Sequence, residues 1–152
     1  MTNVTHREDA PASLEGSFLS QYGAYLALAP ALTALLGSLY YSEVAGFVPC
    51  TLCWYQRILM YPLPLIILIG IIQQDEYLSN YVLPFSLLGI GFSAYHYLIQ
   101  IGIFSQPDTC LGGIPCGLRY VNYFGFVTIP FMALTAFVLI TGVMIVVKWT
   151  TR

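Results

Sequence analysis

Four long apolar stretches limit what this chain can fold into. A helix needs about 20 apolar residues to cross the roughly 30 Å of hydrocarbon in a bilayer. The first, third and fourth stretches contain no Asp, Glu, Lys or Arg, and the second contains only Arg57. The pattern predicts an all-α membrane protein, a four-helix transmembrane bundle. The predicted spans cover residues 22–41, 53–72, 81–101 and 123–147.

Composition supports a chain whose surface faces lipid. Charged residues make up 8% of the sequence and hydrophobic residues 58%, whereas soluble domains carry about 25% charged residues. The formal net charge is −2 and no basic run occurs. Nucleic-acid binding therefore has no electrostatic basis here, and we expect membrane lipid to be the surrounding solvent.

The spans divide the chain into a membrane domain with two short tails. We expect a loose cytoplasmic tail over residues 1–20, the membrane domain over 21–148 and a cytoplasmic C-terminal tail over 149–152. A signal peptide is the alternative, because residues 27–29 (Ala-Leu-Ala) resemble a cleavage site. The apolar run continues well beyond them, which favours an uncleaved first helix.

All four cysteines lie at or between spans, two in each of two connectors. Cys50 and Cys53 precede or begin the second span, and Cys110 and Cys116 lie between the third and fourth. An even number of spans places both loops on the same side of the membrane. Such a distribution is expected when the loops face an oxidising, extracytoplasmic compartment.

The spacing Cys50-x-x-Cys53 is typical of redox-active dithiols. Pro49 suits the first turn of a helix, so Cys50, Cys53 and Arg57 share one helical face. In such motifs the N-terminal thiol can be a stabilised thiolate. A thiolate on Cys53 would also lie near the positive end of the helix dipole, one turn above a guanidinium.

Two polar residues inside the spans are candidates for function. Arg57 and His96 each lie about one turn from the loop end of a span, so they share a depth. Arg57 could simply snorkel to the interface, and a lone intramembrane histidine is often only packed and hydrogen-bonded. With Gln56 beside Arg57 and a dithiol above it, a functional site is the preferred interpretation.

The second cysteine pair lies in a turn-rich segment. Gly112, Gly113 and Pro115 separate Cys110 from Cys116, a composition typical of loops. We expect a disulfide there that is exposed and open to thiol attack. A structural loop staple is the alternative. A zinc site of all four cysteines is another, but it leaves the intramembrane polar residues unexplained, so we expect no metal.

The run Pro-Cys-Thr-Leu-Cys-Trp-Tyr-Gln-Arg over residues 49–57 resembles the signature of the DsbB family of membrane disulfide-generating proteins. The following Ile-Leu-Met-Tyr-Pro-Leu and the short C-x₅-C pair are similar to its BdbC branch, known from Gram-positive bacteria. Residues 95–100 resemble the end of the family's third helix. The resemblance extends from about residue 20 to the C-terminal region.

This resemblance implies an enzyme of the bacterial cell membrane, a thiol:quinone oxidoreductase. It would reoxidise an extracytoplasmic thioredoxin-like thiol oxidase of the DsbA or BdbD type. Electrons would pass to a respiratory quinone, menaquinone or ubiquinone, and so support disulfide bond formation in secreted proteins. Gram-negative members separate the second pair by a much longer segment, which bears on the choice of partner.

The family's roles carry over residue by residue. The partner would attack Cys110, the released Cys116 would attack Cys50, and Cys53 would face the quinone. Quinone binding is expected at three residues, Arg57, Gln56 and His96.

Two other functions fit parts of the pattern. One is a non-catalytic four-span protein with two structural loop disulfides. The other is an enzyme similar to vitamin K epoxide reductase, in which the C-x-x-C pair tends to come late in the chain. Here the pair opens the second span, which favours the DsbB-like interpretation.

Overall fold

The structure is a computed structural model that describes residues 12–110 and 113–150. Within these residues it contains four helices long and apolar enough to span a membrane and no strand beyond one isolated β-bridge. The predicted all-α, four-span bundle is therefore confirmed. Its elements are α1 (Ala12–Leu39), the π-helix η1 (Tyr40–Val44), α2 (Thr51–Met60), α3 (Pro62–Gln73), α4 (Leu78–Gln100), the 3₁₀ helix η2 (Asp108–Cys110) and α5 (Ile129–Thr150).

The span boundaries differ from the predicted ones at both ends of the chain. Helix α1 already begins at Ala12, so residues 12–20 are helical where a loose tail was expected. Residues 1–11 lie outside the described part. Helix α5 begins at Ile129, six residues late, because residues 123–127 form a turn closed by two backbone hydrogen bonds. Gly125, at φ +85°, occupies that turn.

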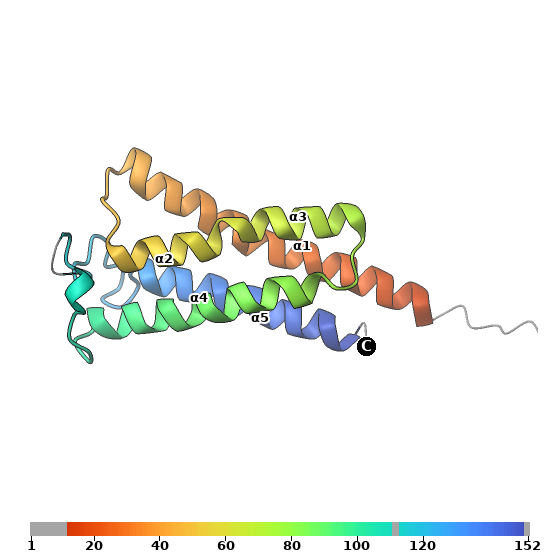
Figure 1. The fold of residues 1–152 in the computed structure, drawn as a ribbon. Coiled ribbons are helices and arrows are strands. Elements are labelled where there is room, and N and C mark those ends of the chain that lie inside the picture. The colour runs from red at the N-terminus through yellow and green to blue at the C-terminus, as the bar shows by residue number, and fades with distance from the viewer. Residues whose placement is uncertain (1–11, 111–112, 151–152) are drawn as a thin grey trace, which may run out of the picture.

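Both cysteine loops lie at one end of the bundle (Figure 1). The α1–α2 connector and the segment containing η2 meet there. The α3–α4 connector and the C-terminal end of α5 lie at the opposite end. The second span is divided at Tyr61, where α2 ends and Pro62 starts α3. Proline has no backbone N–H to continue the helix, so α2 is a separate short helix carrying the C-x-x-C pair.

The bundle core is apolar and tightly packed, and α5 makes its most extensive contacts with α4 and α1. Small side chains on α1 let the larger ones of α3 and α5 approach closely. The outer faces are apolar as well, which is the arrangement lipid requires. The core includes Ala24, Ala27 and Ala31 of α1, Leu63 and Ile67 of α3, and Phe137, Ile140 and Met144 of α5.

Helix α4 turns most of its polar side chains toward the bundle. Ser79, Ser86, Ser93, His96 and Gln100 are all buried on its bundle-facing side. Burial away from lipid lets such groups find partners within the protein. The last two lie at the loop end of the bundle, where they meet the cysteine loops.

Close contact between α4 and α5 depends on Gly89. A Cβ at this position would lie 2.2 Å from the ring of the fully buried Phe137. We expect Gly89→Ala to lower stability by about 1–3 kcal/mol, because the ring must shift in a packed core. Thermal unfolding in detergent measures the change.

Gly91→Ala is the matched control. Gly91 lies on the same helix, and a Cβ at this position would have no neighbouring atom within 4 Å. Alanine also has a higher helix propensity than glycine. Equal melting temperatures for the two variants would contradict the packing that the structure shows.

Candidate functional site

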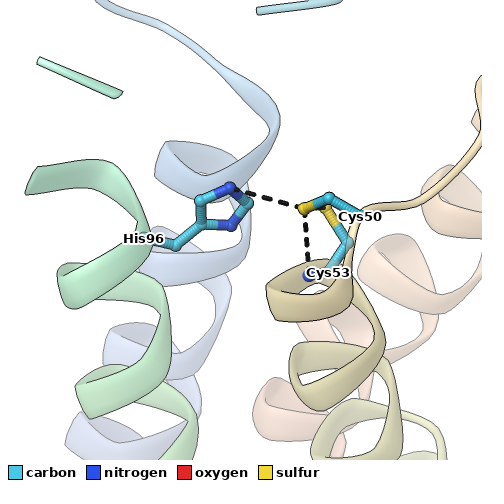
Figure 2. A group of neighbouring side chains, drawn as sticks. All are labelled: Cys50, Cys53 and His96. Carbon is cyan, nitrogen blue, oxygen red and sulfur yellow. Dashed lines mark hydrogen bonds between the residues drawn. The ribbon is translucent and has the colours of Figure 1, made fainter. Parts of the chain in front are cut away.

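The C-x-x-C pair lies at the N-terminus of α2. Cys50 is the N-cap residue, and its Sγ accepts a hydrogen bond from the Cys53 backbone N–H at 3.4 Å (Figure 2). The two sulfurs are 2.9 Å apart and both cysteines are free. A disulfide needs an S–S distance of about 2.0 Å. Only a small side-chain movement is therefore needed for the pair to form a disulfide when an acceptor takes two electrons and the two protons are lost.

His96 of α4 connects this pair to the second loop. Its ring is 1% exposed, and the Gln56 side-chain amide nitrogen donates to Nδ1 at 2.9 Å. Since Nδ1 accepts, the proton lies on Nε2. That N–H donates to the carbonyl oxygen of Cys116 at 3.0 Å. Figure 2 shows the other contact of Nε2, which lies 3.7 Å from the Cys50 sulfur. One imidazole thus contacts both cysteine-bearing segments.

Cys110 and Cys116 form a disulfide, as expected for this loop, with a Cα–Cα distance of 5.6 Å. The expectation that it is exposed is wrong, because the two residues are 2% and 0% exposed. They pack into an apolar cluster with Cys50, Leu52 and Ile99. Turn composition alone does not reveal this burial, since the covering side chains come from α2 and α4.

Polar contacts fix the segment that follows Cys116 to the end of α4. The Gln100 amide nitrogen donates to the Leu118 carbonyl at 3.1 Å. The Arg119 guanidinium donates in return to the Gln100 backbone carbonyl. The second loop is therefore held by hydrogen bonds from two α4 residues, His96 and Gln100.

Arg57 turns toward α1 rather than toward His96. Its guanidinium donates to the Ser38 carbonyl at 3.3 Å and to the Ser42 hydroxyl, and it lies 5.6 Å from the centroid of the Trp54 ring. Ser42 belongs to the π-helical turn η1, a form often found at functional sites. Ser42 carried no signal in the sequence, because helical periodicity does not predict a π turn.

A cavity of about 460 Å³ lies between α1, α2 and α5. Cys53, Gln56 and Arg57 line it, and the rest of its wall is largely apolar. The structure thus brings these three predicted site residues together. His96 is not among the described residues that line it. The sequence predicted that His96 and Arg57 bind the same ligand, but the His96 ring lies beside the Cys50 sulfur.

Three stacked aromatic rings border this cavity. Phe47 of the first loop lies between Tyr41 of η1, at 5.9 Å, and Tyr120 of the second loop, at 4.8 Å between ring centroids. The rings come from three separate segments, so no local sequence pattern pointed to the stack. It joins both loops to the end of the first span.

Hydrogen bonding determines which sulfur of the dithiol carries charge. The hydrogen bond from the Cys53 thiol is the main cause, and together with His96 it lowers the pKa of Cys50 to about 4 although burial opposes the shift. The position of Cys50 at the N-terminus of α2 also lowers its pKa. The reduced pair therefore holds its thiolate on Cys50, whereas the sequence also favoured Cys53.

Comparison with known proteins places this chain in a family. Residues 20–147 match the family described as "Disulfide bond formation protein DsbB". The chain belongs to the DsbB family. Membership, together with four membrane-spanning helices, makes it a multi-pass membrane protein of disulfide bond formation, an oxidoreductase role.

Relatives in bacilli support this assignment. "Disulfide bond formation protein C" of Bacillus subtilis (strain 168) is 51% identical over 125 residues, covering 82% of this chain and 91% of the relative. "Probable disulfide formation protein C" of Halalkalibacterium halodurans is 55% identical over 111 residues, covering 72% and 81%. The predicted resemblance to DsbB and its BdbC branch is confirmed. No solved structure matches this chain.

The depressed pKa of Cys50 predicts thiol reactivity in acid. In a reduced Cys110→Ala/Cys116→Ala variant, the rate of Cys50 alkylation by iodoacetamide should stay near its maximum from about pH 5 to pH 8, because the thiolate persists above its pKa. The rate should fall only as the pH drops through about 4. Peptide mass spectrometry at several pH values measures it.

Cys53→Ala provides the control, since it removes the largest cause of the shift. Its alkylation midpoint should move to higher pH. If alkylation of Cys50 in the parent had its midpoint at about pH 8.5, the pKa of an ordinary cysteine, the assignment of the thiolate to Cys50 would be refuted.

Proposed function

We propose that this DsbB-family protein is a thiol:quinone oxidoreductase. It oxidises an extracytoplasmic thioredoxin-like thiol oxidase of the DsbA or BdbD type and passes the electrons to a respiratory quinone. One observation carries the proposal: Cys53 and Arg57 line the same largely apolar cavity, while Cys50 lies beside the second cysteine pair. The C-x-x-C motif thus stands between an electron source and a site for an acceptor.

The cavity suits a quinone in size, polarity and position. Ligand pockets of about 300–1,000 Å³ hold small organic molecules, and this one lies among membrane-spanning helices, where a lipid-soluble molecule enters. A menaquinone or ubiquinone held by these residues would supply an acceptor for two electrons and two protons. The Arg57 guanidinium can stabilise negative charge on a ring oxygen, and the Gln56 amide can donate a second hydrogen bond.

The cysteines can transfer electrons by successive thiolate attacks. A partner thiolate bonds to Cys110, which breaks the Cys110–Cys116 bond and releases Cys116 as a thiolate. Cys116 then bonds to Cys50 of an oxidised Cys50–Cys53 pair, and Cys53 leaves as a thiolate. The partner's second thiol releases the oxidised partner from Cys110. Cys110 then attacks Cys116, which restores their bond and leaves Cys50 and Cys53 reduced.

Burial of the second disulfide adds a step. Cys110 is 2% exposed, so the partner reaches it only after the loop moves out of its apolar cluster. We place this end of the bundle on the extracytoplasmic side, because thiol oxidation belongs to oxidising compartments. Both termini are then cytoplasmic, and the cysteine loops face the partner.

Quinone absorbance tests the proposal directly. Detergent-purified protein is mixed with a reduced thioredoxin-like oxidase and a soluble quinone. We expect loss of oxidised quinone that depends on the partner and is abolished by Cys50→Ser or Cys53→Ser, because each removes a sulfur from the path. Parent-rate reduction by Cys53→Ser would overturn the assignment.

The buried bridge also fits a protein whose disulfides are only structural. Reduction potentials separate the two functions. Structural disulfides lie below about −300 mV, whereas exchanging ones lie higher. No quinone loss, together with two potentials below that value, would establish the structural function instead.

Ser42 is expected to orient Arg57 toward the quinone. Ser42→Ala removes one charge-assisted hydrogen bond, so we expect kcat/KM for quinone to fall about 10-fold. The effect should appear mainly in KM, with a larger loss for Arg57→Ala and partial recovery in Arg57→Lys. Steady-state kinetics with varied quinone measure these effects.

Ser86→Ala is the matched control. It is a buried serine whose hydroxyl donates to the Leu83 carbonyl of its own helix, away from the cavity. If both serine variants lost the same activity, the hydrogen bond to Arg57 would have no specific role.

A further inference from the structure

Cys50, Cys53 and His96 form a compact group of potential metal ligands. Their two Sγ atoms and one imidazole nitrogen all lie within 4.8 Å of one another, and His96 and Cys50 are buried (Figure 2). We propose that the reduced protein binds one thiophilic metal ion of the zinc class through these three residues. The site differs from the four-cysteine zinc site considered from the sequence, because Cys110 and Cys116 are bonded to each other.

Ligand spacing supports this site. With Zn–S bonds of about 2.3 Å and Zn–N bonds of about 2.0–2.1 Å, tetrahedral ligand atoms lie about 3.5–3.8 Å apart. His96 Nε2 is already 3.7 Å from the Cys50 sulfur. The two sulfurs, 2.9 Å apart, need to separate by roughly 0.9 Å to reach that spacing. Side-chain rotation at the start of α2 achieves this without moving the helix.

Charge is balanced when the ion binds. Two thiolates and a neutral imidazole neutralise a divalent cation, so no net charge is buried. Protons remaining on the dithiol pass to solvent, and neither sulfur nor metal changes oxidation state. The ion binds only the reduced pair, because the sulfurs of a Cys50–Cys53 disulfide are no longer thiolates.

The hydrogen bonds of His96 permit the required tautomer. A metal on Nε2 needs the proton on Nδ1, which must then find an acceptor. Gln56 lies 2.9 Å from Nδ1, and a half-turn of its amide presents oxygen in place of nitrogen. Such a partner on the second ring nitrogen is usual for metal-bound histidine. His96 gives up its bond to the Cys116 carbonyl, so metal binding loosens the second loop.

A fourth ligand position is available beside the three residues. A cavity of about 20 Å³ is lined by Cys50, Cys53, His96 and Gln100, among others, which is enough for one water molecule. Within the described part of the chain, Gln100 Oε1 is buried and has no hydrogen-bond partner. A metal-bound water would supply the missing donor. This orphaned oxygen is evidence for the site independent of the cysteines.

Bound metal would hold both sulfurs as ligands and so keep the pair from forming its disulfide. The reduced protein can therefore either bind the metal ion or be reoxidised to the Cys50–Cys53 disulfide. Its existence requires neither a quinone nor a partner protein.

Cobalt(II) is a suitable probe, because thiolate–cobalt coordination absorbs in the near ultraviolet and visible. We expect the reduced Cys110→Ala/Cys116→Ala variant to bind one Co²⁺ per chain with tetrahedral bands, and Zn²⁺ to displace it. Gln56→Leu should weaken binding about 10- to 100-fold, the usual cost of losing such a supporting hydrogen bond. His96→Ala should weaken it at least as much.

Ser93→Ala is the matched control, a buried residue near His96 on the same helix, and should bind as tightly as its parent. Equal affinity in His96→Ala would show adventitious binding by the dithiol alone and overturn the site, as would binding to the oxidised protein. His96→Gln replaces His96→Ala if the latter fails to fold. Because quinone is absent from the assay, its outcome does not depend on the proposed electron transfer.

Discussion

The hydrogen bonds of one buried imidazole organise the loop end of this bundle. His96 accepts from Gln56 of α2 and donates to the Cys116 carbonyl of the second loop. Other hydrogen bonds also join the second loop to α4, but the His96 bonds connect α2 to both, where the remaining contacts are largely apolar and not directional. The bonds also set the tautomer of the ring. The same side chain therefore contacts both cysteine-bearing segments and adds to the effect of Cys53 in lowering the pKa of Cys50.

The lipid environment explains why the spans contain few polar residues and why Arg57 and Gln56 have hydrogen-bond partners within the protein. A buried polar group in a bilayer must find its partner within the protein. Arg57 finds Ser38 and Ser42 of the first span, whereas Gln56, on the adjacent position of α2, reaches α4. Both residues line the cavity, but the hydrogen bonds of these neighbouring residues run to two different helices. A largely apolar cavity lies on one side and the second cysteine pair on the other.

The fold could be predicted from hydropathy because span length and composition are local properties. The start of α5 could not, since the 123–127 turn depends on Gly125 and on backbone pairing within an apolar run. Helical spacing predicted Cys50, Cys53 and Arg57 on one face; Cys53 and Arg57 of α2 do line one cavity, whereas Cys50 caps the start of that helix. Burial of Cys110–Cys116 and the separation of His96 from Arg57 depend on contacts between elements, which no local pattern contains.

The stack of Tyr41, Phe47 and Tyr120 has a mechanical consequence. Phe47 has a ring on each face, one from the first span and one from the second loop. All three residues border the large cavity. A displacement of the second loop that carried Tyr120 with it would leave one face of the Phe47 ring uncovered. The stack therefore couples the position of the second loop to the wall of the cavity, so a movement of that loop also changes the surroundings of Cys53 and Arg57.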